Sequence, residues 1–144
     1  MIRKGKEEDI ERIIEMGLRL TKESSYSNTI MSPERVRTTC ETLITHGFFV
    51  VAEKDGEVIG AMLGDVYQPW HSFDKIGIDY VLYVEPEHRN GMIAAKMIRN
   101  FESWCKSMGA KQVRPGVGTG NPSGIRLYKG LGYQSVGEWF LKNI

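Results

Sequence analysis

The sequence predicts a single-domain α/β fold in which a mixed, mostly antiparallel β-sheet is flanked by helices. Three observations indicate this class. The chain has 144 residues, the size of one ordinary domain. Its 41% hydrophobic and 26% charged residues are typical of a globular protein. Its predicted elements follow the order β-α-α-β-β-β-α-β-α-β, which places helices on the faces of a sheet. With no linker or repeat, we expect one domain over residues 1–144.

The first elements are a short strand and two helices. Strand-like Ile2–Arg3 precedes apolar residues at helical spacing over Ile10–Leu18, which follow an acidic turn. The polar stretch Thr21–Ser32 predicts a loop. Ser32 then serves as an N-cap before Pro33, a good first helical residue, and the second helix should end near Thr45.

A hairpin and a third strand occupy the middle of the chain. The β-rich runs Phe48–Glu53 and Glu57–Val66 flank Asp55-Gly56, a strong signal for a tight turn between antiparallel strands. The polar and aromatic stretch Gln68–Ser72 interrupts the pattern. Ile76–Val84 then predicts a further strand that ends before Pro86.

The remaining elements are a long helix, a strand, a short helix and a closing strand. Apolar residues from Ile93 to Met108 mark one helical face, and Gly109 supplies the stop. Lys111–Val117 predicts a strand, Asn121–Gly130 a short helix, and Tyr133–Leu141 a strand that completes the sheet.

Several classes of protein are excluded or disfavoured by composition. The apolar runs are far shorter than the roughly 20 residues that cross a bilayer, and the charged start lacks a signal-peptide apolar region. We therefore expect a cytoplasmic protein with no membrane partner. Cys40 and Cys105 have no partner at disulfide-framework or zinc-ligand spacing. We expect both to be buried thiols and expect no metal site.

The net charge of +1 hides an asymmetry. Residues 1–85 carry 10 basic and 15 acidic side chains, giving −5, and residues 86–144 carry 9 basic and 3 acidic ones, giving +6. The second part should attract anions. Its basic residues follow no recognised nucleic-acid-binding motif, so no nucleic-acid partner is expected.

The segment from Leu82 to Ala94 points to an anion site. A strand ends at Glu85-Pro86, and a short loop leads into the long helix. The backbone N–H groups at such a helix start have no partner within the helix, and together with the helix dipole they can bind phosphate oxygens.

This segment resembles the cofactor motif of the GCN5-related N-acetyltransferase (GNAT) superfamily, V-x-P-x-x-R/Q-x-x-G-x-G/A. Val84, Pro86, Arg89 and Ala94 fall on the pattern. Met92 replaces the usual middle glycine, and a glycine lies one residue earlier, at Gly91. The resemblance implies that the backbones of Leu82 and Val84 contact the pantetheine arm of acetyl-coenzyme A. It implies that the pyrophosphate is bound by Arg89, Asn90, Gly91, Met92, Ile93 and Ala94.

A second segment, Asn121–Tyr133, resembles the family's N-x-x-A-x-x-L-Y-x-x-x-G-F/Y pattern, with Gly124 in place of the usual alanine. The resemblance implies that Asn121 helps to fix the cofactor arm. It also implies that the Tyr128 hydroxyl lies near the cofactor sulfur and donates a proton to the leaving thiolate.

The resemblance implies acetyl transfer from acetyl-coenzyme A to a primary amine by direct attack in a ternary complex. That reaction needs a route for the amine proton and a donor for the thioester oxygen, for which the Val84 N–H is suited by resemblance. Asp79 is our candidate base. Asp65, Glu53 and His71 are rivals.

The acceptor, a small molecule or a protein amine, is expected to be cationic because acidic residues 1–85 include the regions 21–32 and 67–75. Both regions should flank the acyl carbon. The candidate substrate-binding residues are Tyr26, Trp70, His71 and Phe73. A noncatalytic coenzyme A-binding sensor or regulatory module is the alternative function, and a nucleic-acid-binding domain ranks far below. The oligomeric state cannot be predicted.

Overall fold

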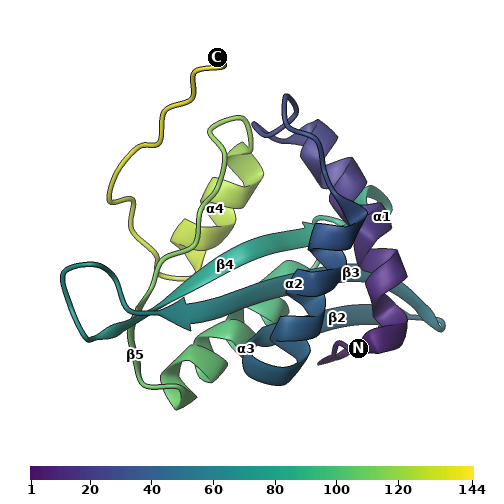
Figure 1. The fold of residues 1–144 in the computed structure, drawn as a ribbon, viewed down its shortest axis with the longest axis horizontal. Helices are drawn as coiled ribbons and strands as arrows, with labels where there is room; N and C mark the ends of the chain where they lie inside the picture. The colour runs from purple at the N-terminus through teal and green to yellow at the C-terminus, as the bar shows by residue number, and fades with distance from the viewer.

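The computed structural model describes residues 1–144 and contains one open five-stranded sheet with helices on both faces (Figure 1). The strands are β1 (Ile2–Lys4), β2 (Phe48–Lys54), β3 (Glu57–Tyr67), β4 (Lys75–Val84) and β5 (Ala110–Val113). They lie in the order β1-β2-β3-β4-β5, with antiparallel pairing from β1 to β4 and parallel pairing between β4 and β5. The predicted fold class is confirmed.

Four α-helices and two 3-10 turns accompany the strands. They are η1 (Glu7–Asp9), α1 (Ile10–Glu23), α2 (Pro33–His46), η2 (Pro86–His88), α3 (Ile93–Ser107) and α4 (Pro122–Gly130). No helix combines the length and the apolar character needed to span a lipid bilayer.

Two apolar cores lie on opposite faces of the sheet. On one face, Ile10 and Ile13 of α1 and Leu43 of α2 pack against strand residues such as Val51. On the other, α3 contributes Phe101, which is fully buried. Figure 1 shows the same layering, with α1 and α2 on one side of the strands and α3 on the other.

Short-range sequence signals are confirmed by the backbone. The Ser32 hydroxyl accepts a hydrogen bond from the Arg35 N–H at 3.1 Å, which caps α2. Asp55 and Gly56 have φ values of 52° and 78°, as a tight hairpin turn requires. Gly109, which follows α3, has a φ of 83°, a conformation that favours glycine. Both cysteines are buried free thiols, as expected.

The first helix is longer than predicted. It runs to Glu23, so residues 21–23, expected in a loop, are helical. The Thr21 hydroxyl donates to the Gly17 carbonyl oxygen at 2.8 Å. This bond gives the Thr21 hydroxyl a partner within the helix.

Two predictions for the C-terminal part are wrong. β5 ends at Val113 rather than Val117, because it pairs with β4 only over Lys75–Gly77 and the following residues have no ladder partner. The predicted closing strand Tyr133–Leu141 is absent, and Trp139 and Phe140 are 97% and 90% exposed. Its aromatic and apolar residues suit a strand, but a strand also needs a neighbouring backbone to pair with, and the four-residue β5 offers little edge.

Candidate active site

A gap opens where β4 separates from β5. Lys75, Ile76 and Gly77 pair with β5, whereas the rest of β4, as far as Val84, pairs with β3 alone. Leu127 and Tyr128 of α4 belong to the same apolar cluster as Leu82 and Val84, so α4 borders this gap.

A β-bulge in β4 decides which side chains face which side. The register passes from the pair Leu63–Val81 to the pair Gly64–Asp79, which makes Tyr80 the extra residue. Side chains alternate between the two faces of a strand. The Asp79 side chain, before the bulge, faces α3 and α4. The Val81 side chain, after it, faces α1 and α2. A Cβ on Gly64 would lie 2.7 Å from the Ile78 carbonyl oxygen, so glycine is required opposite the bulge.

The backbone of β4 presents unpaired polar groups to the gap. The Glu85 N–H donates to the Ile59 carbonyl oxygen of β3 at 2.8 Å. Because alternate residues of a strand point their backbone groups to opposite sides, those of Tyr83 also point to β3, and those of Leu82 and Val84 point away from it. The Val84 carbonyl oxygen accepts a hydrogen bond from Arg89 Nε at 2.7 Å. The Leu82 and Val84 N–H groups therefore face the gap.

The loop before α3 has the features of an anion site. The N–H groups of Asn90, Gly91 and Met92 donate to no acceptor in the chain, and the first N–H groups of α3 have none within the helix. Asn90 adopts a left-handed φ of 70°. A Cβ on Gly91 would meet nothing within 4 Å. Neither the φ of Gly91 nor the packing of the protein therefore requires glycine at this position. A ligand that approached the backbone closely would require it. The Met92 side chain is 66% exposed.

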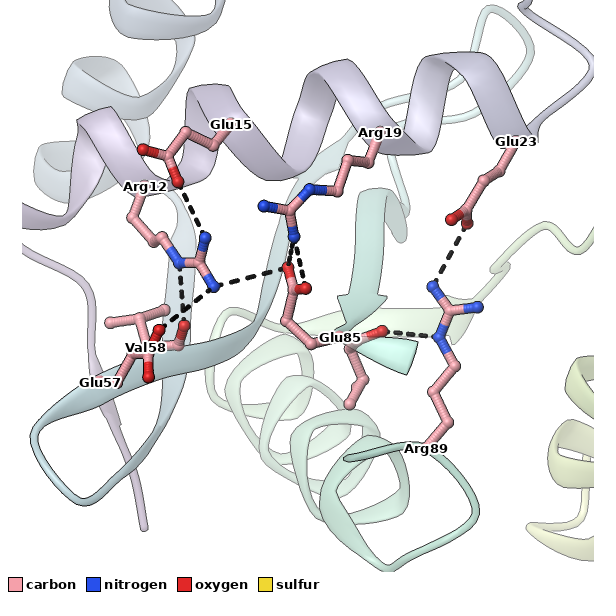
Figure 2. Close-up of polar contacts among 9 residues, drawn as sticks. Arg12, Glu15, Arg19, Glu23, Glu57, Val58, Glu85 and Arg89 are labelled. Carbon is pink, nitrogen blue, oxygen red and sulfur yellow. Dashed lines mark hydrogen bonds and ion pairs between the residues drawn. The ribbon is translucent and has the colours of Figure 1, made fainter. Parts of the chain in front are cut away.

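Arg89 holds this loop to α1 (Figure 2). Besides its bond to Val84, its guanidinium donates to the Glu23 carboxylate at 3.2 Å and lies 5.1 Å from the centre of the Tyr83 ring. Arg89 was expected to contact the pyrophosphate. In this structure its hydrogen bonds position the backbone of the loop.

Glu85, which precedes the loop, is a second anchor to α1. It is 4% exposed, and its carboxylate pairs with Arg19 and lies 3.6 Å from Arg12 (Figure 2). Arg12 also donates to the Val58 carbonyl oxygen at 3.0 Å. Ion pairs of Glu85, before η2, and of Arg89, after it, therefore hold the end of β4 against α1.

Two candidate catalytic side chains occur together beside the gap. The Tyr128 hydroxyl is buried and has no hydrogen-bond partner. Its burial, with the nearby Asp79 charge, raises the pKa of Tyr128, so the phenol keeps its proton. Burial also raises the pKa of Asp79, whose carboxylate accepts a hydrogen bond from the Gly116 N–H at 3.3 Å. A buried proton donor and a half-buried carboxylate of raised pKa thus occupy one side of β4.

The sequence comparison decides the family. The Acetyltransferase (GNAT) family matches residues 16–133, most of the chain. This chain belongs to the GNAT family. Among curated proteins, N-acetyltransferase family 8 member 2 of Rattus norvegicus is 31% identical over 100 residues, covering 69% of this chain and 44% of the relative. N-acetyltransferase 8F1 of the same organism is 27% identical over 117 residues, covering 81% and 52%. The chain spans about half the length of these relatives.

Solved structures show the same fold at low identity. A predicted acetyltransferase with acetyl-CoA from Clostridium acetobutylicum matches with a TM-score of 0.83 and 17% identity, covering 99% of this chain and 95% of that one. An aminoglycoside 6'-N-acetyltransferase from Acinetobacter haemolyticus matches with a TM-score of 0.77 and 19% identity, covering 100% and 99%. These likenesses establish the GNAT fold of the chain.

The residues expected to bind the acceptor are not brought together in this GNAT fold. Trp70, His71 and Phe73 lie in the β3–β4 connection, at the end of β4 where β5 pairs, whereas Tyr26 follows α1, whose last residue Glu23 pairs with Arg89 beyond the other end of β4. All four are exposed, and the Trp70 and His71 rings contact each other edge-on at 5.5 Å. A ten-residue strand spans roughly 33 Å, so the regions 21–32 and 67–75 do not both flank one point of β4.

The rival bases are occupied elsewhere. Glu53 pairs with Arg3 at 3.0 Å on the β1 side of the sheet, and an Asp65 carboxylate oxygen accepts a hydrogen bond from the Val66 N–H at 2.8 Å. His71 lies in the β3–β4 connection. Among the four candidates, Asp79 alone lies beside Tyr128.

Asn121 and Glu85 each have a structural role that the sequence interpretation did not give. The Asn121 side chain accepts a hydrogen bond from the Gly124 N–H at 3.0 Å, so it caps α4. The anchoring role of Glu85 was missed by the sequence interpretation. A carboxylate between an apolar strand and a proline could have indicated a buried ion pair. Its partners could not be identified from the sequence, because Arg12 and Arg19 are 73 and 66 positions away.

Proposed function

We propose that this GNAT chain transfers the acetyl group of acetyl-coenzyme A to a primary amine by direct attack in a ternary complex. The observation that carries the proposal is the buried, unpartnered Tyr128 hydroxyl beside the β4–β5 gap. An unsatisfied buried hydroxyl destabilises a protein. That cost is offset when a bound ligand forms a hydrogen bond with the hydroxyl.

The residues present fit acetyl-coenzyme A. The free N–H groups of Asn90, Gly91 and Met92, with the start of α3, suit the negatively charged pyrophosphate. The outward backbone groups of Leu82 and Val84 suit the amide groups of the pantetheine arm. We expect Arg89 to keep the loop in place through Glu23 and Val84 rather than to lie on the phosphates.

The chain's own groups then serve each step of the transfer. The Val84 N–H would donate to the thioester oxygen as negative charge develops there. The amine nitrogen forms a bond to the acetyl carbon, and the carbon–sulfur bond breaks. Asp79 accepts the proton that the amine gives up, directly or through water, and Tyr128 donates a proton to the departing thiolate. Most of the acceleration would come from holding both reactants in line.

Binding and turnover test the proposal together. A ligand at 100 times its dissociation constant stabilises the native state by about 2.7 kcal/mol. With an unfolding entropy of about 2.1 cal/mol/K per residue, the 144 residues give about 0.3 kcal/mol/K, so saturating acetyl-coenzyme A should raise Tm by about 9 °C.

Free thiol is then followed with a panel of primary amines. Amine-dependent thiol release supports the enzyme. A Tm shift without turnover on any amine would instead support a coenzyme A-binding sensor. The cofactor assignment would be wrong if Tm stayed constant and calorimetry registered no heat.

A further inference from the structure

An apolar pocket of about 220 Å³ lies beneath α1 and α2, against β3 and β4. Met16, Leu20, Val36, Cys40 and Ala61 are among its lining residues. Burial raises the pKa of the Cys40 thiol to about 11, so this side chain is neutral and behaves as an apolar one. The pocket can therefore hold an apolar group without leaving a charge unpaired.

The pocket shares a wall with the proposed reaction site. Tyr80, Val81 and Tyr83 line it, and they belong to the stretch of β4 whose Leu82 and Val84 backbone faces the β4–β5 gap. The bulge at Tyr80 turns two consecutive side chains, Tyr80 and Val81, toward the pocket. A ligand in the pocket is thus separated from the gap by one strand.

The charge at the rim disfavours a polycationic acceptor. Arg35 is the single charged residue that lines the pocket. It is exposed and takes part in no ion pair, unlike Arg37, which pairs with Glu11. No carboxylate lines the pocket. A polycation would meet repulsion from Arg35 and gain no compensating partner.

Gly17, an unusual residue for the middle of a helix, leaves space for the pocket beneath α1. Glycine in a helix interior is unfavourable relative to alanine, yet Gly17 lies in the middle of α1 and lines the pocket. A Cβ there would lie 3.6 Å from the Met31 methyl group, an ordinary contact. Packing therefore does not require glycine, and the residue is explained by the space that it leaves.

From these observations we infer that the pocket binds the apolar substituent of the acceptor amine, so that the acceptor is a primary amine with an aliphatic or aromatic group rather than a polyamine. The inference rests on the proposed function. A dry apolar cavity of about 150 Å³ binds benzene, so the present volume suffices for a six-carbon chain or a phenyl ring.

A series of amines tests the inference. Initial rates are measured with methylamine, n-butylamine, n-hexylamine and spermidine at saturating acetyl-coenzyme A. The expected kcat/KM rises about fourfold for each methylene that enters the pocket, and spermidine falls below n-hexylamine. A kcat/KM independent of chain length, or highest for spermidine, would overturn the pocket assignment while leaving acetyl transfer intact.

Substitutions at Gly17 test whether the chain-length dependence of kcat/KM arises in this pocket. Gly17→Leu fills the pocket, so the chain-length dependence should disappear, while the Tm shift caused by acetyl-coenzyme A stays as in wild type. Gly17→Ala should raise Tm by about 3 °C and still lower kcat/KM for n-hexylamine severalfold. Thr42→Ala on α2 is the matched control, because Thr42 is exposed and does not line the pocket. It should improve helix propensity without changing selectivity.

Direct binding separates this inference from the proposed function. Calorimetry with n-hexylamine on the coenzyme A-bound protein should show saturable binding that Gly17→Leu abolishes. If that binding occurs but no amine is acetylated, the acceptor role is overturned together with the proposed function. If amines are acetylated and Gly17→Leu retains the chain-length dependence, the inference alone is overturned.

Discussion

Replacing Tyr128 with phenylalanine should stabilise the protein while slowing the reaction. The ring is 7% exposed, and its hydroxyl has no partner. A buried hydroxyl without a hydrogen bond costs about 1–3 kcal/mol. Taking the lower end gives a gain of about 1 kcal/mol in the free energy of unfolding. At about 0.3 kcal/mol/K for 144 residues, Tm should rise by about 3 °C.

The same variant should lose turnover. Phenylalanine keeps the ring and its edge-on contact with Tyr133, whose ring centre is 5.2 Å away, but it removes the proton donor. The expected fall in kcat is about 10²-fold, the lower end for general acid catalysis, with little change in acetyl-coenzyme A affinity. Thermal melting and thiol release measure the two effects on one preparation.

Tyr133→Phe is the matched control, because it removes a neighbouring buried hydroxyl that has no assigned role in the reaction. It should leave kcat within about twofold. The reasoning about Tyr128 is refuted if Tyr128→Phe lowers Tm, since the hydroxyl would then have a partner within the protein. A kcat within about twofold of wild type, measured where thiol departure limits the rate, would equally remove the acid role.

Three further changes have defined outcomes. Met92→Gly should preserve or tighten acetyl-coenzyme A binding in calorimetry, because the exposed side chain makes way for the phosphates, and it should leave helix stability nearly unchanged because Met92 is the N-cap of α3, a position that accepts glycine; a large loss of affinity in a folded variant would contradict this. Burial raises the pKa of Asp79, so kcat/KM should fall as pH drops through that raised value. Asp79→Asn should remove this acidic limb and lower the rate at neutral pH, and an unchanged pH profile would eliminate Asp79 as the base. Glu85→Gln should raise the KM for acetyl-coenzyme A about tenfold by loosening the loop, whereas Glu57→Gln, on an exposed carboxylate 3.9 Å from the same Arg12, should leave it unchanged; equal effects would refute the anchoring role.

Sequence patterns predicted the elements whose causes are local. The Ser32 cap, the Asp55-Gly56 turn and the Gly109 stop each depend on one or two residues and their neighbours. The strand–loop–helix segment before α3 is equally local, and its N–H groups are free as predicted. These features depend on short-range geometry that the residue types impose directly.

Features that depend on distant pairing could not be predicted. The bulge at Tyr80 arises from the register between β3 and β4, and it alone decides that Asp79 lies on the side of Tyr128. Arg89 turns toward Glu23, 66 residues earlier in the chain, which no local pattern reveals. The absent closing strand has the same origin, because the residue types of 133–141 favour a strand but specify no partner for pairing.

The account's central claim is that amine acetylation occurs at the β4–β5 gap, and product analysis tests it most directly. The wild-type protein is incubated with acetyl-coenzyme A and a primary amine, and both the free thiol and the acetylated amine are quantified by mass spectrometry. The account predicts one acetylamide for each thiol released, at a rate that Tyr128→Phe reduces about 10²-fold. Thiol release without acetylated amine, or no release at saturating acetyl-coenzyme A with any amine, would contradict it.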